Sequence, residues 1–318
     1  MNNRIAILIP YFGKWPEWID LYFYSCSQNT IADWYFMTDC VIPEKRYSNL
    51  NFKSCTFSEY CQEVSDKLGI DFKPQNAYKL CDLKPFYGFI HKDILQPYEF
   101  WGFADADILW GDIAAFYTND LLTNYDVFST HNDRLSGHFS IFRNNKYYRE
   151  LCFSIPTWEK RLCESINYAL DEGSFSKLIY PETAFIGKVY RQVIMKIMDW
   201  KTAWEFYYTV FPLFRLFLKL RRKRLYFVEQ HTTPILNPDG RLYKYESDTW
   251  FYENGVVSNS RTSRKYIYLH FMIFKKNNIK SHYYWEKGFY KIPRNFEFDN
   301  KVIVNKQGIT VAEKLVRT

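Results

Sequence analysis

Two aspartates, Asp105 and Asp107, lie one residue apart within an otherwise apolar stretch, WGFADADILWG at 101–111. An unpaired ionised carboxylate in a dry interior is costly, so the pair needs cations or hydrogen bonds, or must lie where a strand ends. Residues i and i+2 of a strand point to the same face, and at a strand end both carboxylates can approach one hard divalent cation. Such a cation would bridge the phosphates of a bound nucleotide and neutralise the charge on the leaving group. The alternative is structural: one aspartate caps a turn and the other pairs with a surface lysine.

The elements that must position this pair alternate between strand and helix patterns over the first 130 residues, as in an α/β unit. The apolar run at 4–10 is typical of a parallel strand covered on both faces, and Pro16 opens a helix with apolar residues at i, i+3, i+4 and i+7 spacing. Further strands are predicted at 33–39, around 52–55 and up to the two aspartates, with helices at 57–68 and 76–95. Ligands of open α/β sheets bind at the carboxyl ends of the strands. We therefore expect the ends at 10–13, 38–39 and 105–107 to form a site.

The rest of the chain changes character along its length. Two more strands are predicted at 125–130 and 137–142, then a mostly helical stretch at 145–170, and short strand-like runs such as 266–271 follow beyond residue 225. No internal repeat and no Gly/Ser linker is present, so the parts are expected to pack on one another. The predicted organisation is a nucleotide-binding and catalytic core at 1–195, a basic aromatic amphipathic segment at 196–230 and a closing or acceptor region at 231–318.

The basic aromatic segment has its most distinctive residues at 204–224. It begins WEFYYTVFPLFRLFLKL and includes a cluster of cations that dominates the net charge of +7: Lys219, Arg221, Arg222, Lys223 and Arg224. The segment is too polar to span a bilayer but suits an anionic lipid surface, where each cation adds about 1 kcal/mol. The alternative is a core helix with a solvated basic end. A nucleic-acid partner is not expected, because no helix-turn-helix, zinc-finger or RNA-binding signature is found.

The composition is that of a globular protein. Aromatic residues make up 20% of the chain while glycine and proline number 12 each, which excludes disordered and collagen-like chains. The seven cysteines show no CxxC pair and no metal-ligand spacing, which indicates reduced core residues of a cytosolic protein. No signal peptide is indicated, and no run reaches 18 uncharged apolar residues, so we expect a cytoplasmic protein without a spanning helix.

Several stretches together carry a resemblance to a known family. FADADILWGDIAAFY followed by SGHFSIFRNNKYYRE resembles metal-dependent GT-A glycosyltransferases. More closely, IPYFGKWPEW, AYKLCDLKPFYG, FWGFADADILWGDI, GHFSIFRN and YLHFMIFKK resemble a bacterial family of O-antigen and capsular polysaccharide glycosyltransferases that includes galactofuranosyltransferases. The resemblance covers roughly 4–192 and 262–276, and implies a GT-A-like, Rossmann-type mixed sheet flanked by helices, here with a C-terminal helical, aromatic and basic membrane-associating segment.

The resemblance also implies a metal site for Mn²⁺ or Mg²⁺. Asp107 would be the direct ligand, Asp105 would contact the ribose or the metal through water, and His270 would complete the shell, with Lys276 as a diphosphate contact. The glycine-containing form of the motif around the histidine is absent, since Phe-Met-Ile follows it. The alternative for His270, between Leu and Phe, is a core histidine.

The donor, a UDP-sugar, would be held by residues that lie along several of these motifs. Those implied are Pro10, Tyr11, Phe12, Asp39, Lys79, Asp82, Lys84, Asp105, Gly137, His138 and Lys276, with Asp133 a further candidate for the sugar hydroxyls. For the first strand end, the alternative is a turn bracketed by Gly13 and Pro16 that needs no ligand. For Lys79 and Asp82, i,i+3 neighbours on a predicted helix, the alternative is a solvated ion pair.

An inverting transfer also needs a general base for the acceptor hydroxyl, and a positioned carboxylate contributes typically about 10²–10⁴-fold. Asp171 and Glu172 lie at the end of a predicted helix before Gly173, where the resemblance places an acidic pair in the acceptor site. The alternative is two carboxylates in a solvated turn.

The sequence therefore predicts a glycosyltransferase that moves a hexose, galactose or galactofuranose, from a UDP-sugar to an undecaprenyl-diphosphate-linked glycan. It would work in O-antigen or capsule synthesis, peripherally on the inner face of the plasma membrane. Two alternatives are a metal-dependent phosphohydrolase or nucleotidyltransferase, which also uses paired aspartates, and a non-catalytic glycan-binding assembly protein.

Overall fold

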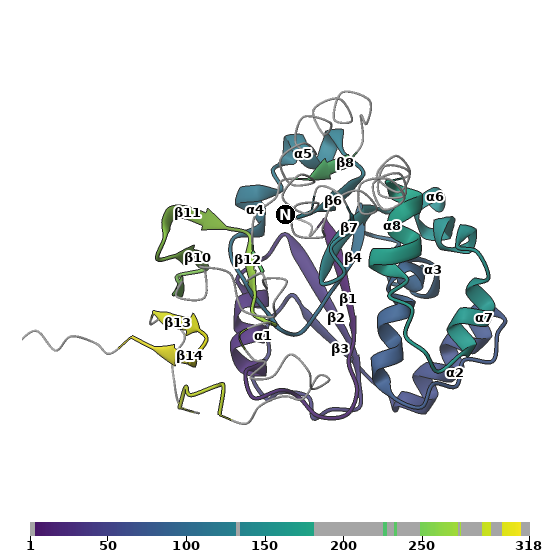
Figure 1. Cartoon of the computed structure of the whole chain (residues 1–318), viewed down its shortest axis with the longest axis horizontal. Helices are drawn as coiled ribbons and strands as arrows, with labels where there is room; N and C mark the ends of the chain where they lie inside the picture. Colours follow the sequence, from purple (N-terminus) through teal and green to yellow (C-terminus); the bar gives the residue numbers. More distant parts are fainter. Residues whose placement is uncertain are drawn as a thin grey trace, which may run out of the picture.

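A seven-stranded sheet forms the centre of the molecule, with strand order β3-β2-β1-β4-β7-β6-β8 (Figure 1). The computed structural model describes residues 4–131, 134–180, 225–227, 232–233, 249–272, 274, 288–293 and 301–312. The strands of the central sheet are β1 (Ile5–Pro10), β2 (Ala32–Thr38), β3 (Leu50–Ser54), β4 (Phe100–Ala104), β6 (Val127–Ser129), β7 (Phe139–Arg143) and β8 (Leu225–Phe227). Strands β1 to β4 are parallel, while β7 runs antiparallel to both β4 and β6. The predicted mixed α/β sheet is confirmed.

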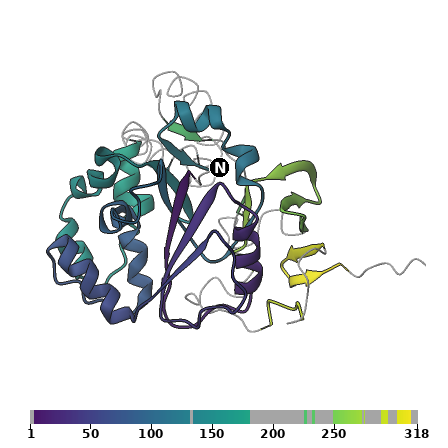
Figure 2. The same ribbon diagram turned by 180° about the vertical axis from the view of Figure 1, so that it is seen from behind.

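Helices cover both faces of this sheet, as Figures 1 and 2 show from opposite sides. The helical elements are α1 (Ile19–Ser27), α2 (Phe57–Leu68), η1 (Ala77–Phe86), α3 (Tyr87–Ile90), α4 (Ile113–Phe116), α5 (Asn119–Asn124), α6 (Lys146–Glu150), η2 (Leu151–Ser154), α7 (Trp158–Cys163), η3 (Asp171–Phe175) and α8 (Ser176–Ile179). Along β1, Ile5, Ile7 and Ile9 pack toward α1, while Ala6 and Leu8 pack into the opposite core. The continuous apolar run is therefore explained by burial of the strand on both faces.

Two predicted helices differ in their limits. Helix α1 begins at Ile19 rather than at Pro16, whose carbonyl accepts the Ile19 amide in a preceding turn. The stretch predicted as one helix at 76–95 is the 3₁₀ helix η1 followed by the single-turn α3. Pro85 lies inside η1, where a proline removes a backbone donor and disfavours a regular α-helix.

The predicted helical stretch at 145–170 is also broken, into α6, η2 and α7. The acidic pair predicted at a helix end instead opens η3, a π-helical turn that begins at Asp171. Ala169, two residues earlier, has a left-handed backbone with φ of 47° and turns the chain into η3.

The C-terminal strands form two further sheets. Strand β12 (Tyr268–His270) pairs antiparallel with β5 (Ile108–Trp110), and a five-stranded sheet has the order β11-β10-β9-β13-β14. Its strands are β9 (Trp250–Glu253), β10 (Val256–Asn259), β11 (Thr262–Tyr266), β13 (Val302–Asn305) and β14 (Gly308–Val311). This sheet shares a hydrophobic cluster with Trp18, which precedes α1, and with Leu21 within α1.

All seven cysteines lie in the described part of the chain and none is in a disulfide. Four are buried, but Cys163 is exposed, so the prediction that all are core residues is wrong there. None of the helices in the described ranges combines the length and apolar character needed to cross a membrane. The segment at 196–224, Asp133 and Lys276 lie outside the described residues.

Candidate functional site

The two aspartates lie on a tight turn rather than within a strand, because β4 ends at Ala104 and β5 begins at Ile108. Three distant segments hold this turn at 105–107. Its first amide donates to the carbonyl of His138 (3.0 Å), its middle carbonyl accepts the Trp18 indole (2.8 Å), and its last carbonyl accepts the Phe271 amide (3.1 Å). The turn is therefore fixed by the core and by the C-terminal region together.

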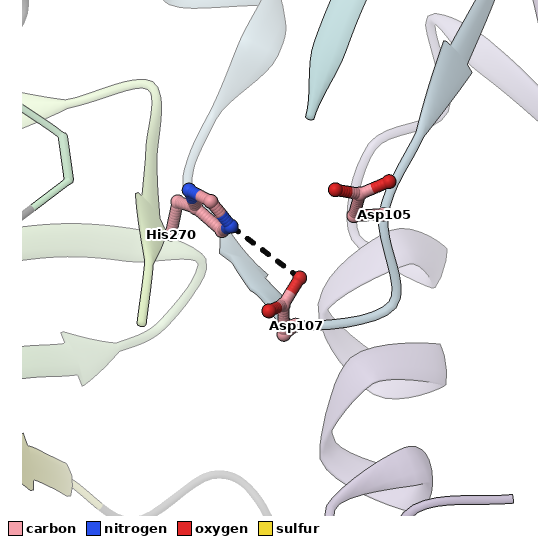
Figure 3. Close-up of side chains that lie close together, drawn as sticks. All are labelled: Asp105, Asp107 and His270. Atoms are coloured by element: carbon pink, nitrogen blue, oxygen red, sulfur yellow. Dashed lines mark ion pairs between the residues drawn. The ribbon is translucent and has the colours of Figure 1, made fainter. Parts of the chain in front are cut away.

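His270 reaches the turn through the pairing of β12 with β5, which sets it opposite Ile108. Its Nε2 lies 3.5 Å from Oδ1 of Asp107, and both side chains are buried. Figure 3 shows these two side chains and Asp105 around a common space. One ligand atom from each of the three residues lies within 4.8 Å of the others.

These three residues fit a divalent cation. His270 Nε2 is buried without a hydrogen-bond partner among the described residues, whereas its Nδ1 lies 3.1 Å from the Thr233 hydroxyl. A buried polar atom without a partner is uncommon and needs an explanation, and a bound cation would supply one. Carboxylate oxygens suit Mn²⁺ and Mg²⁺, and an imidazole nitrogen is a common ligand of transition metals.

Lys84 connects this centre to a second acidic group. Its ammonium lies 2.6 Å from Oδ1 of Asp105, donates to the carbonyl of Gly137 (2.7 Å) and lies 3.7 Å from Oδ2 of Asp171. Burial alone would lower the pKa of Lys84, but the neighbouring carboxylates, Asp105 first, raise it well above its usual range. Lys84 is therefore a fixed cation between two carboxylates.

Asp171 is buried at 5% exposure, whereas its neighbour Glu172 is exposed. Burial raises the pKa of Asp171 to about 6, although Lys84 acts in the opposite direction. Glu172 accepts the Gly137 amide (3.0 Å), and a Cβ on Gly137 would lie 2.8–2.9 Å from atoms of both acidic side chains. The structure thus brings together Asp171, Glu172, Gly137 and Lys84, which the sequence singled out in separate motifs.

Lys79 and Asp82 form an ion pair (2.9 Å) with side chains that are 3% and 0% exposed, so the alternative of a solvated pair is wrong. Lys79 also donates to the carbonyls of Arg161 and Ile166, and Asp82 accepts the amides of Tyr168 and Leu170. These polar groups bind the chain's own backbone.

His138 is stacked on His270, with ring centroids 4.1 Å apart and an interplanar angle of 17°. Its Nε2 lies 2.7 Å from the hydroxyl of Tyr268. Burial, and then the adjacent His270, lower the pKa of His138 well below its ordinary value. His138, which the sequence assigned to the donor sugar, therefore packs against the candidate metal ligand His270.

The first two strand ends form an edge beside this centre. The Tyr11 ring stacks on Trp15 at 4.9 Å, and its hydroxyl donates to the Lys14 carbonyl. Asp39 is exposed and accepts the amide of Gly13 (2.7 Å), whose φ of 104° requires glycine at this turn.

The other two residues predicted at the first strand end differ in direction. Phe12 packs into the core against Phe57 and Tyr60, so its side chain does not take part in the predicted base contact. Pro10 is the half-buried last residue of β1.

Three residues at the centre were not predicted: Trp18, Thr233 and Tyr268. Tyr268 lies two residues before His270 on one strand, so strand periodicity places both on the same face. Trp18 and Thr233 carry no local signal, because their contacts span long stretches of chain.

The fold and site define a mixed α/β protein with a candidate divalent-cation centre where its central sheet presents the carboxyl ends of its parallel strands. The chain belongs to the family of unknown function DUF6625, whose profile matches residues 7–300. No curated protein matches the chain. The family description gives no activity, so the resemblance to O-antigen and capsule enzymes stays a prediction.

Solved structures similar to this chain include two glycosyltransferases. The galactosyltransferase LgtC, in complex with donor and acceptor sugar analogues, is 9% identical with a TM-score of 0.33, over 55% of this chain and 70% of that chain. The glycosyltransferase GlyE of Streptococcus pneumoniae TIGR4 is 12% identical with a TM-score of 0.33, over 57% of this chain and 44% of that chain. At these TM-scores the likeness does not establish a shared activity.

Proposed function

We propose that this protein is a metal-assisted glycosyltransferase that uses a nucleotide-sugar donor. The observation that carries the proposal is the convergence of Asp105, Asp107 and His270 beside the buried carboxylate of Asp171. The buried Nε2 of His270 faces Asp107 and has no hydrogen-bond partner among the described residues. When bound by these three residues, Mn²⁺ or Mg²⁺ would neutralise charge on the donor diphosphate. The mixed oxygen and nitrogen ligands favour Mn²⁺, because Mg²⁺ prefers oxygen ligands alone.

The chain's own residues supply the remaining chemistry. Asp171 is the proposed general base for the acceptor hydroxyl, because a pKa of about 6 leaves it mostly ionised at neutral pH yet close enough to accept a proton efficiently. Lys84 holds Asp105 in place and keeps a positive charge beside the donor. Transfer with inversion follows from a carboxylate that activates the acceptor without forming a covalent bond.

The donor would lie along the strand ends. We assign the nucleoside to Pro10, Tyr11, Phe12 through its backbone, and Asp39. Gly137 is assigned to the donor sugar on the motif resemblance. Its lack of a side chain lets Asp171 and Glu172 pack against the backbone, since a Cβ there would meet both. Lys276 is proposed as a diphosphate contact on sequence grounds.

The finer assignment rests on the motif resemblance. We propose a UDP-hexose donor, galactose or galactofuranose, and an undecaprenyl-diphosphate-linked glycan acceptor in O-antigen or capsule synthesis. The cationic segment at 204–224 supports attachment to the cytoplasmic face of an anionic membrane. We propose three parts with separate tasks. Donor binding and catalysis belong to the core at 1–195, membrane attachment to the segment at 196–230, and closure over the acceptor to the region at 231–318.

A metal-dependent phosphohydrolase or nucleotidyltransferase is the second candidate, because Asp171 and Glu172 add carboxylates near the first pair. However, the Lys84 ammonium lies between Asp105 and Asp171, at 2.6 and 3.7 Å, and so occupies the position where a second cation would bridge them. Two-metal hydrolysis needs such a place. This contact favours transfer.

The test is a thermal-shift titration with UDP, with and without Mn²⁺, on the wild type and on Asp107→Ala. Ligand at 100 times its dissociation constant should stabilise the wild type by about 2.7 kcal/mol, only with metal, and should not stabilise the variant. Asp93→Ala is the matched control, because Asp93 is exposed and its ion pair is with Lys67, which is not a residue of the site. Incubation with UDP-sugars then separates the candidates. Release of UDP, with the sugar passed to an acceptor glycan or to water, supports glycosyl transfer, whereas release of UMP or phosphate, by cleavage at phosphorus, supports hydrolysis. Absence of any nucleotide binding supports a glycan-binding protein.

A further inference from the structure

The charged residues of the 3₁₀ helix η1 contact two parts of the molecule, the candidate metal centre and the loop before η3. Lys84, near its end, contacts Asp105 and Asp171, while Lys79 and Asp82 contact the loop that leads into η3. A 3₁₀ helix has three residues per turn, so Lys79 and Asp82 lie one above the other. One short element therefore reaches both the proposed metal centre and the segment that carries the proposed base.

The contacts of the Lys79–Asp82 pair end on that loop and on helix α7 just before it. Lys79 Nζ donates to the carbonyls of Arg161 (2.6 Å) and Ile166 (2.5 Å), and with the 2.9 Å bond to Asp82 all three ammonium hydrogens are used. Asp82 accepts the amides of Tyr168 (2.9 and 3.1 Å) and Leu170 (3.1 Å). The buried pair therefore fixes four backbone groups between residues 161 and 170.

The backbone that these bonds hold is strained two residues before Asp171. Ala169 has φ of 47°, a left-handed conformation that disfavours any residue with a Cβ. Leu170 is fully buried after it, and Asp171 then lies with Oδ2 3.7 Å from Lys84. Such strain persists where surrounding contacts over-determine the conformation. Asp82 supplies the contacts on either side of Ala169, to the amides of Tyr168 and Leu170, while the Ala169 amide donates to Asn167 (2.9 Å).

We infer that Lys79 and Asp82 are positioning residues that hold the segment at 166–171 so that Asp171 stays buried against Lys84. This inference rests on the proposed function for the role of Asp171, but differs from the predicted donor contacts of Lys79 and Asp82. Of the metal ligands, Asp107 and His270 are anchored elsewhere, through the turn bonded to Trp18 and through β12. Asp105 is held by Lys84, whose own bonds do not involve Lys79 or Asp82. Loosening the pair should therefore reduce the rate of the chemical step and leave metal and donor binding intact.

The test uses Asp82→Asn, which keeps an acceptor oxygen but removes the charge that holds Lys79. Hydrogen exchange of the peptide at 164–172 should accelerate at least about tenfold, while peptides over 100–110 stay unchanged. With UDP-galactose, or whichever UDP-sugar the wild type uses, kcat should fall by the order of 10- to 100-fold with KM for the donor and Mn²⁺ affinity within about twofold. Lys79→Met with Asp82→Asn is the second variant, because it removes both charges if the single variant does not fold.

The matched control is Asp126→Asn, which breaks the ion pair of another buried aspartate, with Arg143 at 2.6 Å, and neither of these two residues belongs to the site described above. It should lower stability without this loss of kcat. Unchanged exchange at 164–172 in the Asp82 variant, unchanged kcat despite faster exchange, or a parallel loss of UDP and Mn²⁺ binding would each overturn the inference. If the wild type transfers no sugar, the proposed function fails, and faster exchange confined to 164–172 would still support the positioning of Asp171.

Discussion

Replacing Asp171 with asparagine should stabilise the protein at neutral and alkaline pH while it removes the proposed base. The folded chain raises the pKa of this carboxyl from 3.8 to about 6, chiefly by burial. A group with a raised pKa in the folded state stabilises when protonated, so its contribution is full below pH 4 and is lost as the pH rises through about 6. The difference between the two pKa values corresponds to about 3 kcal/mol of strain on the ionised form.

An amide at this position carries no charge at any of these pH values. Asp171→Asn should therefore match the wild type only below pH 4, exceed it at pH 5 by about half of the full difference, and exceed it at pH 8 by up to about 3 kcal/mol, a rise in Tm of roughly 4–8 °C. The measurement is thermal or urea unfolding of both proteins at pH 5 and pH 8, with no metal or nucleotide added. Transfer activity should fall by about 10²–10⁴-fold in the same variant.

The control is Asp126→Asn, because Asp126 is equally buried but lies 2.6 Å from the Arg143 guanidinium. Loss of this carboxylate leaves a cation without its partner, so that variant should be less stable at both pH values. If Asp171→Asn loses stability equally at pH 5 and pH 8, the ionised carboxylate is not strained by its surroundings and the reasoning about the base is refuted.

Three further substitutions probe the rest of the site. His270→Ala should weaken Mn²⁺ binding in titration calorimetry and abolish the Mn²⁺-dependent stabilisation by UDP; unchanged Mn²⁺ affinity would show that His270 is a core residue. Gly137→Ala should displace the acidic pair, since its Cβ would lie 2.8–2.9 Å from Glu172 and Asp171 atoms, and should cost about 1–3 kcal/mol in unfolding together with most of the activity. Lys84→Met should raise the pKa of Asp171 by about 1–3, because the cation at 3.7 Å favours the ionised carboxylate. The acid limb of the pH–rate profile should move to higher pH by the same amount. If that limb does not move, Asp171 is not the base.

The sequence was sufficient to predict the strand ends that carry the site, because each of these strands was predicted from a short local run of apolar residues. The apolar runs before Pro10, Asp39 and Asp105 are short, and burial on both faces makes them continuous. The aspartates were also visible locally, since carboxylates within an apolar run are costly without partners. Only their exact element was wrong, because β4 ends one residue before them.

Other parts of the site depend on contacts between distant segments and could not be predicted. The i,i+3 spacing places Lys79 and Asp82 on one face of a helix but does not show what covers that face; the covering amides come from Tyr168 and Leu170. The start of η3 was missed because the chain reverses at Ala169, where neither glycine nor proline marks the turn.

The described contacts divide the site into two parts with separate anchors. The turn with Asp105 and Asp107 depends on Trp18 and on the pairing of β12 with β5, so it requires segments from both ends of the chain. Asp171 depends instead on η1, through the buried pair before it and through Lys84 beside it. Lys84 contacts both parts, with bonds to Asp105 and Gly137 on one side and Asp171 on the other. A cation at this point lowers the repulsion between the carboxylates, so the carboxylate base Asp171 can lie close to the carboxylates of the candidate metal centre. Loss of Lys84 should therefore affect both parts of the site, whereas loss of Asp82 should affect only the part that carries Asp171.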